Sequence, residues 1–152
     1  MGYNYWNGTE AAHRRVMMKA AGYSDEDIRQ KPHIGIPNSY MAGSPGTAHL
    51  RQVTEAVKEG IWAAGGIPVE FGIPATCGNV ANGADEMKYE QVGRDIVAMS
   101  IEFVSRIHNF DAICCVASCD LIIVRMLSGS VQTGYSGSGS DRGINAGRKL
   151  LW

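Results

Sequence analysis

Three short apolar runs alternate with two longer amphipathic segments along the middle of the chain. The apolar runs lie at residues 33–37, at 67–73 and from 111 onward, and their β-branched residues are typical of buried strands. Between them, residues 48–64 and 89–108 carry apolar side chains three or four positions apart, which is the periodicity of an α-helix. This alternation predicts parallel strands joined by right-handed crossovers. We therefore expect an α/β fold, a three-layer parallel sheet with flanking helices.

The loops that follow the predicted strands contain polar side chains suited to binding a ligand. In a parallel sheet the carboxyl ends of the strands lie at one edge, and ligands bind in the loops beyond it. Asn38 and Ser39 follow the first strand, and His49 opens the next helix, so all three are candidate substrate contacts. Each has an ordinary alternative, because Asn-Ser is common in turns and a histidine at a helix start can cap or pack.

The third apolar run, DAICCVASCD at residues 111–120, ends in a thiol next to a carboxylate. Cys119 offers a soft sulfur ligand and Asp120 a hard oxygen ligand, which suggests two different metal centres that share a corner. The alternative is a buried cysteine followed by an aspartate that caps the next element, and this is the commoner meaning of an isolated Cys-Asp pair.

Charge and cysteine usage narrow the class of protein. The 152 residues carry a net charge of −1, which favours neither nucleic acid nor an anionic membrane as a partner. The four cysteines lack the spacing of a secreted disulfide framework. No signal-peptide pattern opens the chain, and no apolar run approaches the roughly 18 residues of a membrane span. We expect a cytoplasmic protein.

Several segments share their sequence and their order with one enzyme family. They are KPHIGIPNS (31–39) with PGTAHLR (45–51), VKEGIWAAGGIPVEF (57–71), GADEMKYEQVGRDIVA (83–98) and SCD (118–120). Together they resemble the N-terminal part of the dihydroxy-acid dehydratase and phosphogluconate (sugar-acid) dehydratase family. The resemblance runs from about residue 9 to residue 126, which is most of the chain.

The resemblance implies a lyase that dehydrates a 2,3-dihydroxy acid or a sugar acid to a 2-keto acid, as in branched-chain amino acid biosynthesis. It implies an iron–sulfur cluster that acts as a Lewis acid on the leaving 3-hydroxyl, and a magnesium ion that holds the carboxylate and 2-hydroxyl of the substrate. The implied partner is a small dihydroxy carboxylate, and a homo-oligomer is a possible assembly. Family subunits are several times longer than this chain, so we expect a fragment that is inactive alone.

The cluster and magnesium ligands of the family are only partly matched. Cys119 matches a cluster ligand and Asp120 matches a magnesium ligand. The family's lysine after that aspartate, also a magnesium ligand, is Leu121 here. The position of the family's first cluster cysteine is occupied by Gly46 here, and some family members also have glycine at that position. Because one thiolate cannot hold a cluster, the chain alone is not expected to bind the iron–sulfur cluster or the magnesium.

A second magnesium carboxylate is also missing from its usual place. The family's Asp-Gly pair after the second strand falls on Gly78-Asn79. Asp85 or Glu86, in the same loop, is a candidate replacement. If these departures are losses, the alternative is a non-catalytic α/β module that keeps the scaffold, with at most a vestigial metal site.

Residues 128–152 are rich in Gly and Ser, which predicts a disordered tail after a partial dehydratase domain at 1–127. One permitted coding of residues 129–143, read from its second base, gives AAFRLDIPAVVVTG. That peptide resembles the segment with which the family continues. We therefore expect a change of reading frame after about Leu127.

Overall fold

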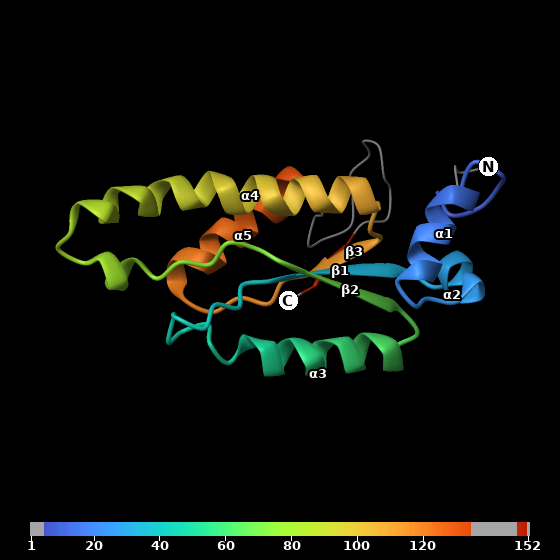
Figure 1. Cartoon of the computed structure of the whole chain (residues 1–152), viewed down its shortest axis with the longest axis horizontal. Coiled ribbons are helices and arrows are strands. Elements are labelled where there is room, and N and C mark those ends of the chain that lie inside the picture. Colours follow the sequence, from blue (N-terminus) through green and yellow to red (C-terminus); the bar gives the residue numbers. More distant parts are fainter. Residues whose placement is uncertain (1–4, 135–148, 152) are drawn as a thin grey trace.

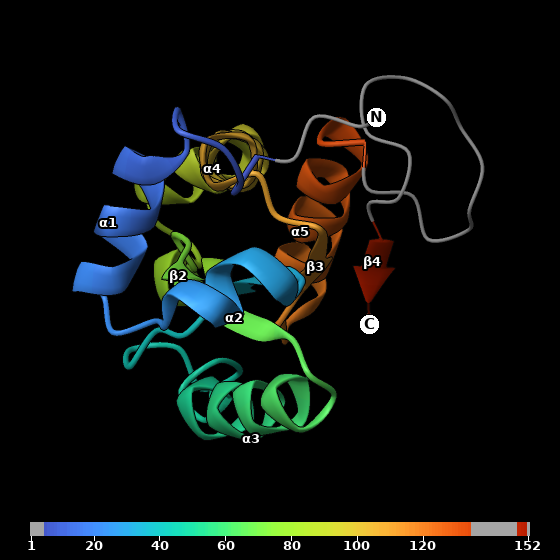
Figure 2. The same cartoon turned by 90° about the vertical axis from the view of Figure 1, so that its right-hand side faces the viewer.

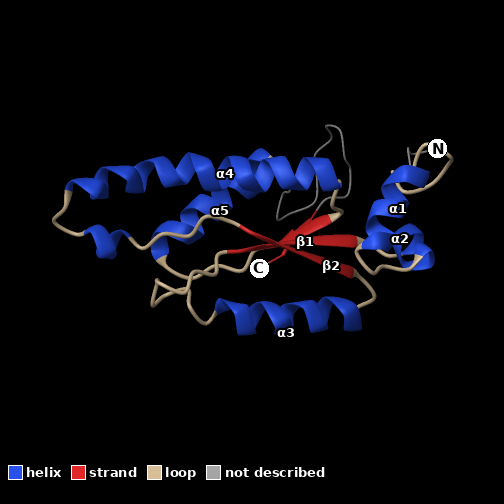
Figure 3. Cartoon of the chain, viewed as in Figure 1, coloured by secondary structure: helices blue, strands red, loops and turns tan. Residues whose placement is uncertain are grey.

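The computed structural model describes residues 5–134 and 149–151 of the chain. The strands among these residues form one parallel sheet in the order β2-β1-β3-β4 (Figures 1 and 3). They are β1 (His33–Asn38), β2 (Ile67–Gly72), β3 (Ala112–Cys114) and β4 (Lys149–Leu151). All six residues of β1 are buried, as expected for an apolar central strand with neighbours on both sides.

Helices cover both faces of the sheet (Figure 2). One face carries α3 (Leu50–Ala63), and the opposite face carries α4 (Tyr89–His108) and α5 (Asp120–Gln132). Asn109 ends α4 in the left-handed conformation, with φ 49°, which asparagine tolerates better than most residues. The predicted three-layer α/β architecture is confirmed, and both long helices lie within two residues of their predicted bounds.

Shorter elements lie at the two ends of the sheet. The helices α1 (Ala12–Ala20) and α2 (Asp25–Gln30) precede β1 and lie near the amino ends of the strands (Figure 1). The 3₁₀ turns η1 (Gly78–Ala81) and η2 (Asp85–Lys88) occupy the long loop between β2 and α4. The loops after β1, β2 and β3 therefore share the end of the molecule opposite α1 and α2.

The main core lies between the sheet and the α4–α5 layer. Phe110, Ile113 and Ile122 are fully buried there, and Phe110 stacks on Phe71 with 6.0 Å between ring centroids. A Cβ on Gly35 of β1 would collide with the Phe110 ring, so glycine is required where this ring crosses the strand.

The strand β3 is shorter than its apolar run because its continuation bonds to a loop instead of a strand. Val116 accepts hydrogen bonds from the Ser39 backbone N–H at 3.2 Å and from the Ser39 hydroxyl at 2.9 Å. An isolated parallel bridge joins Val116 to Asn38. These bonds hold the end of β1 against the segment that leads to Cys119.

The helix α5 continues past the domain boundary expected at residues 127/128. Ser130 is fully buried, and its hydroxyl donates to the Met126 carbonyl at 2.8 Å. Gly129 packs so closely that a Cβ there would lie 2.9 Å from Cα of Ala98. Residues 128–132 thus belong to the helix rather than to a tail, because this close packing holds them on α4. Of the rest of the expected tail, residues 149–151 form β4, which pairs with β3, and residues 135–148 and 152 lie outside the described residues.

None of the described helices is both long enough and apolar enough to cross a membrane.

Candidate functional site

Cys119 lies at the junction between the β3 segment and α5, in an unusual backbone conformation. Its φ is 79°, a positive value that non-glycine residues rarely adopt, and α5 begins at the next residue, Asp120. Backbone strain of this kind amounts to about 1–3 kcal/mol and concentrates at ligand-binding positions. The observed geometry therefore supports Cys119 as a candidate site residue.

The loop after β1 brings Gly46 against Cys119. A Cβ built on Gly46 would lie 3.6 Å from Cβ of Cys119, and this cysteine is the nearest side chain to that position. These are the two positions to which the family resemblance assigns cluster cysteines. The fold therefore brings together two positions that are far apart in the sequence.

The Cys119 thiol is held in its neutral form. Burial raises its pKa, and its hydrogen bond to Asp120 Oδ1, at 3.4 Å, raises the pKa further. Cys77, from the loop after β2, adds a smaller effect in the same direction. Because the metal-binding form is the thiolate, a metal ion at Cys119 would have to displace the thiol proton.

Asp120 is exposed at the first position of α5. Its Oδ1 accepts the backbone N–H of Leu121 at 2.9 Å in addition to the Cys119 thiol. A carboxylate in the first helical turn is favoured by the partial positive charge of the helix N-terminus. Leu121, the next residue, offers no oxygen or nitrogen from its side chain for a cation.

The candidate substrate residues differ in how available their polar atoms are. Asn38 donates to Glu70 Oε1 at 2.8 Å and accepts the Tyr40 backbone N–H at 2.9 Å. The Ser39 hydroxyl is fully buried and donates to Val116. Both side chains therefore hold the loop together. His49 is exposed at the start of α3 and makes no capping hydrogen bond, so the capping alternative is wrong for it.

The carboxylate nearest to Gly78 is Glu90 on α4, not one of the expected replacements. A Cβ on Gly78 would lie 3.2 Å from both Cγ and Cδ of Glu90. Asp85 is almost fully exposed and pairs with Lys88 at 2.9 Å, whereas Glu86 lines a nearby pocket. Glu90 could not be singled out from the sequence, because a glutamate at the start of an amphipathic helix is ordinary.

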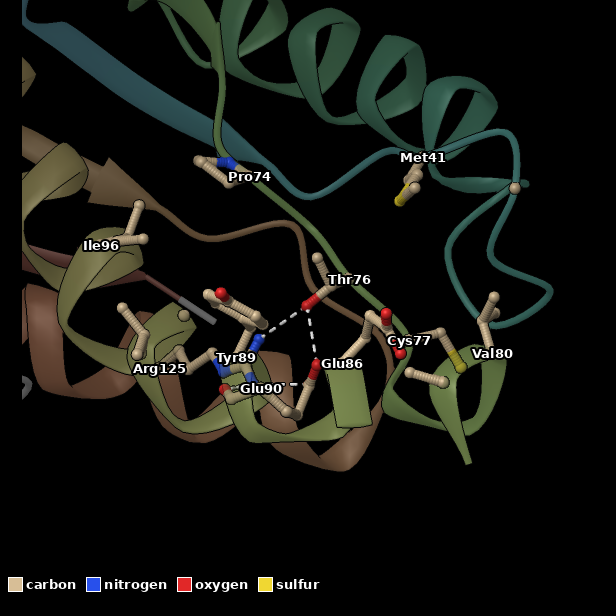
Figure 4. Close-up of a pocket in the computed structure, with 14 residues that line it drawn as sticks. Met41, Pro74, Thr76, Cys77, Val80, Glu86, Tyr89, Glu90, Ile96 and Arg125 are labelled. Carbon is tan, nitrogen blue, oxygen red and sulfur yellow. Dashed lines mark hydrogen bonds and ion pairs between the residues drawn. The ribbon is translucent and has the colours of Figure 1, made fainter. Parts of the chain in front are cut away.

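Glu90 is bound tightly by Arg125 of α5 (Figure 4). Arg125 Nη2 lies 2.5 Å from Glu90 Oε1, and the two side chains are 3% and 10% exposed. Thr76, in the loop after β2, accepts from Arg125 Nη1 and donates to Glu90 Oε2, both at 3.1 Å. A Cβ on Gly93 would lie 2.9 Å from Nη1, so the small residue leaves room for the guanidinium. The network ties two helices to the loop that contains Cys77.

An apolar pocket of about 560 Å³ opens beside this network (Figure 4). Its walls come from the loops after β1 and β2 and from the first half of α4, including Met41, Pro74, Val80, Tyr89 and Ile96. Of the polar residues that border it, Arg125, Glu90 and Thr76 already bind one another, and the remaining charged group is the Glu86 carboxylate. A polar dihydroxy acid would find few hydrogen-bond partners there, so we do not assign the substrate to this pocket.

The residues of the described part do not form a complete metal site. Within residues 5–134, no three His, Cys, Asp or Glu side chains come close enough to hold a metal ion. An iron–sulfur cluster is normally held by several thiols in their thiolate form, whereas the side chain beside Gly46 is Cys119 alone, with Cys77 near enough to Cys119 to affect its pKa. The geometry therefore fits one corner of a cluster or magnesium site and does not fit either whole site.

Comparison with known proteins gives a consistent set of matches. Residues 31–136 match the family model described as dihydroxy-acid/6-phosphogluconate dehydratase N-terminal. A dihydroxy-acid dehydratase of Methanococcus maripaludis is 40% identical over 129 residues, covering 85% of this chain and 23% of that protein. The dihydroxy-acid dehydratase of Methanoregula boonei is 42% identical over 126 residues, covering 83% and 23%. That of Pyrococcus abyssi is 47% identical over 120 residues, covering 79% and 22%. The chain spans about a quarter of the length of these curated relatives.

Proposed function

Because the chain belongs to the dihydroxy-acid/6-phosphogluconate dehydratase family, as its N-terminal domain, we propose that it supplies one corner of a hydro-lyase active site. The substrate is a 2,3-dihydroxy acid or a sugar acid. In the reaction C2 loses a proton and C3 loses its hydroxyl group, which together leave as water. The enol that remains tautomerises to the 2-keto acid.

The contact between Gly46 and Cys119 is the observation that carries this proposal. The family resemblance assigns both positions to the same cluster. In the folded chain, a Cβ built on Gly46 would lie 3.6 Å from Cβ of Cys119. A chance similarity of short segments gives no reason for these two loops to meet. The contact therefore supports Cys119 as a sulfur ligand, with Asp120 beside it as an oxygen ligand.

The chain on its own is proposed to be inactive. The described residues fit neither a whole cluster site nor a whole magnesium site, so we assign no catalytic step to either group. Further residues of a longer dehydratase subunit would have to supply the remaining ligands and the catalytic base. The role assigned to this chain is to provide the scaffold and to position Cys119 and Asp120.

A non-catalytic role is the second candidate, and one observation favours it. The space next to Gly78, where the family resemblance implies a magnesium carboxylate, is occupied by Glu90, and Arg125 neutralises this carboxylate. Leu121 replaces a second magnesium ligand. In this alternative the chain is an α/β module that keeps the family scaffold without the chemistry.

The test begins with the DNA that encodes residue 119 onward, read in all three frames. We expect a neighbouring frame, entered after about residue 127, to continue with a family-like segment and a further cysteine. The frame-restored protein is then reconstituted anaerobically with iron, sulfide and magnesium. It should convert a 2,3-dihydroxy acid or a sugar acid to the corresponding 2-keto acid. If no frame continues in this way, the non-catalytic module becomes the better account.

Two substitutions in the frame-restored protein separate the proposed roles. Cys119→Ser should abolish the visible absorption of the cluster, whereas Cys114→Ser, a matched change on β3, should leave it intact. Asp120→Asn should keep the absorption and lose turnover, because it removes a magnesium ligand only. Full absorption in Cys119→Ser would contradict the assignment.

A further inference from the structure

The side chains of Arg125, Glu90 and Thr76 form a closed set of contacts, which we call the Glu90 clamp (Figure 4). One carboxylate oxygen of Glu90, Oε1, accepts from Arg125 Nη2, and the other, Oε2, accepts from the Thr76 hydroxyl. Arg125 also donates to the Glu90 backbone carbonyl, at 2.6 Å. Both oxygens of this carboxylate therefore have a donor already, and the guanidinium supplies the balancing positive charge.

Two glycines make room for the Glu90 clamp. A Cβ on Gly78 would lie 3.2 Å from both Cγ and Cδ of Glu90, closer than most Cβ atoms approach a neighbour. A Cβ on Gly93 would lie 2.9 Å from Arg125 Nη1. A larger side chain at either position would push against one member of the ion pair. The two small residues and the ion pair therefore belong to one packing arrangement.

The place of the clamp matters because of the proposed function, on which this step rests. The family resemblance assigns a magnesium carboxylate to position 78, and here the Glu90 carboxylate fills the space beside that position. A metal ion there would have Glu90 as its nearest carboxylate, but the guanidinium bound to the same group would repel it. Water screens this repulsion weakly, because the side chains of Arg125 and Glu90 are only 3% and 10% exposed.

We infer that Arg125 takes the place of a metal ion on the Gly78 side of the site, so that this side is closed to divalent cations and keeps its shape without them. The disagreement with the family's ligand set is thus confined to one side. It does not extend to Asp120, whose carboxylate is exposed at the start of α5. A cation held by Asp120 would have to take its other ligands from outside the Glu90 clamp.

The first test is the binding of Mn²⁺, a paramagnetic substitute for Mg²⁺, to the purified chain. Electron paramagnetic resonance measures the free ion during the titration. Wild type and Glu90→Gln should bind Mn²⁺ equally weakly, because exposed carboxylates elsewhere are the same in both. Tighter binding by the wild type than by Glu90→Gln would overturn the inference.

A second measurement on the wild type needs no variant. Urea unfolding curves are compared in about 10 mM MgCl₂ and in NaCl of equal ionic strength. The two midpoints should coincide, because the clamp already contains its own cation. A midpoint that rises specifically with Mg²⁺ would show that a divalent cation binds the folded chain and would contradict a site closed to such ions.

Substitution should open the closed side. Gly78→Asp alone should not create a Mn²⁺ site, because the clamp holds Glu90 in the space that the new carboxylate needs. Gly78→Asp/Arg125→Gln removes the guanidinium and leaves two neighbouring carboxylates without a cation, and hard divalent cations bind such oxygen ligands. We expect this double variant to bind Mn²⁺ at least about tenfold more tightly than Gly78→Asp.

Gly78→Asn/Arg125→Gln is the matched control, because asparagine has the size of aspartate without its charge. It should bind Mn²⁺ no more tightly than the wild type. Tight binding by Gly78→Asp while Arg125 is present would overturn the inference, and so would an Asp-containing double variant that binds no better than its Asn control. If that double variant is unfolded without metal, circular dichroism should show helix returning when Mn²⁺ is added, and no recovery would count against the inference.

These outcomes are separate from the test of the proposed function. They concern cation binding by the purified chain, whereas the hydro-lyase role is tested by the cluster absorption and turnover of the frame-restored protein. A frame-restored protein without turnover would refute the hydro-lyase role and leave the results on the clamp unchanged. Glu90-dependent Mn²⁺ binding would refute the role of Arg125 and leave the assignment of Cys119 unchanged.

Discussion

Gly46 and Cys119 are neighbours in the folded chain although they follow different strands. The loop that contains Gly46 leaves β1, and Cys119 ends the segment that follows β3. A side chain at residue 46 would first meet Cβ of Cys119, at 3.6 Å. The bonds from Ser39 to Val116 hold these two segments together. This contact is the geometric basis for placing residues 46 and 119 in the same part of the proposed active site.

The buried Arg125–Glu90 pair predicts a large and specific effect on stability. Arg125→Met removes the positive charge and leaves the Glu90 carboxylate buried, so the free energy of unfolding should fall by about 3–5 kcal/mol. Urea denaturation measures this change. The double variant Arg125→Met/Glu90→Met should recover most of the loss, because no charge is left unpaired.

An exposed pair serves as the control for Arg125. Arg29 and Asp25 form an i,i+4 pair on α2, and their side chains are 40% and 38% exposed, respectively. Arg29→Met should therefore lower the free energy of unfolding by less than about 1 kcal/mol. If Arg125→Met had an effect as small as that of Arg29→Met, Arg125 would not be the buried partner that the structure shows.

His33 predicts a loss of stability on mild acidification. Burial lowers the pKa of its imidazole below the ordinary value of 6.5, and its Nε2–H donates to the Ile28 carbonyl at 3.1 Å. Below pH 6.5 the unfolded chain binds a proton at His33 that the folded chain does not. The free energy of unfolding should therefore decrease as the pH falls through this value.

The measurement is a series of urea unfolding curves between about pH 7.5 and pH 5.5. His33→Gln removes the titrating group and keeps a side-chain donor, so its stability should depend less steeply on pH than that of the wild type. Parallel pH dependences of the two proteins would contradict the assignment to His33.

Cys115 should be the slowest of the cysteines to be alkylated. Burial raises the pKa of its thiol to about 11, with Ser130 as its hydrogen-bond partner at 3.3 Å. Because the thiolate is the reactive form, its alkylation by iodoacetamide should be slow at pH 8 and should accelerate about tenfold for each pH unit below that pKa. Peptide mass spectrometry reads each site separately. Labelling of Cys115 as fast as the more exposed Cys119 would contradict this burial.

The periodicity of the sequence was sufficient to predict the layers of the fold. Apolar runs and helical spacing depend on local order along the chain, so both long helices and the strands β1, β2 and β3 followed from them, whereas β4 did not. The end of β3 and the course of α5 past residue 127 did not follow, because they depend on contacts with Ser39 and Ala98 from distant segments.

The candidate site was predictable only where neighbouring residues carry the signal. Cys119 and Asp120 stand out together in the sequence. Glu90 and Arg125 look like ordinary charged residues of amphipathic helices, and their pairing needs the packing of α4 on α5. The family resemblance assigned Gly46 to the site, but its distance from Cys119 required the folded structure.

The most direct test of the proposed corner is whether Gly46→Cys forms a disulfide bond with Cys119. The Cβ separation of 3.6 Å lies within the range of about 3.5–4.5 Å found in disulfides. Gly43→Cys is the matched control, because the only neighbour of a Cβ at that position is the Met41 methyl group, at 3.8 Å.

The measurement is the mass-spectrometric map of disulfide bonds after mild oxidation of the purified variants. The account predicts a peptide pair linking residues 46 and 119 in Gly46→Cys, no such link in Gly46→Cys/Cys119→Ser, and no link to residue 119 in Gly43→Cys. A free thiol at residue 46 under conditions that oxidise accessible dithiols would contradict it, because the loops after β1 and β3 would then not meet at Cys119.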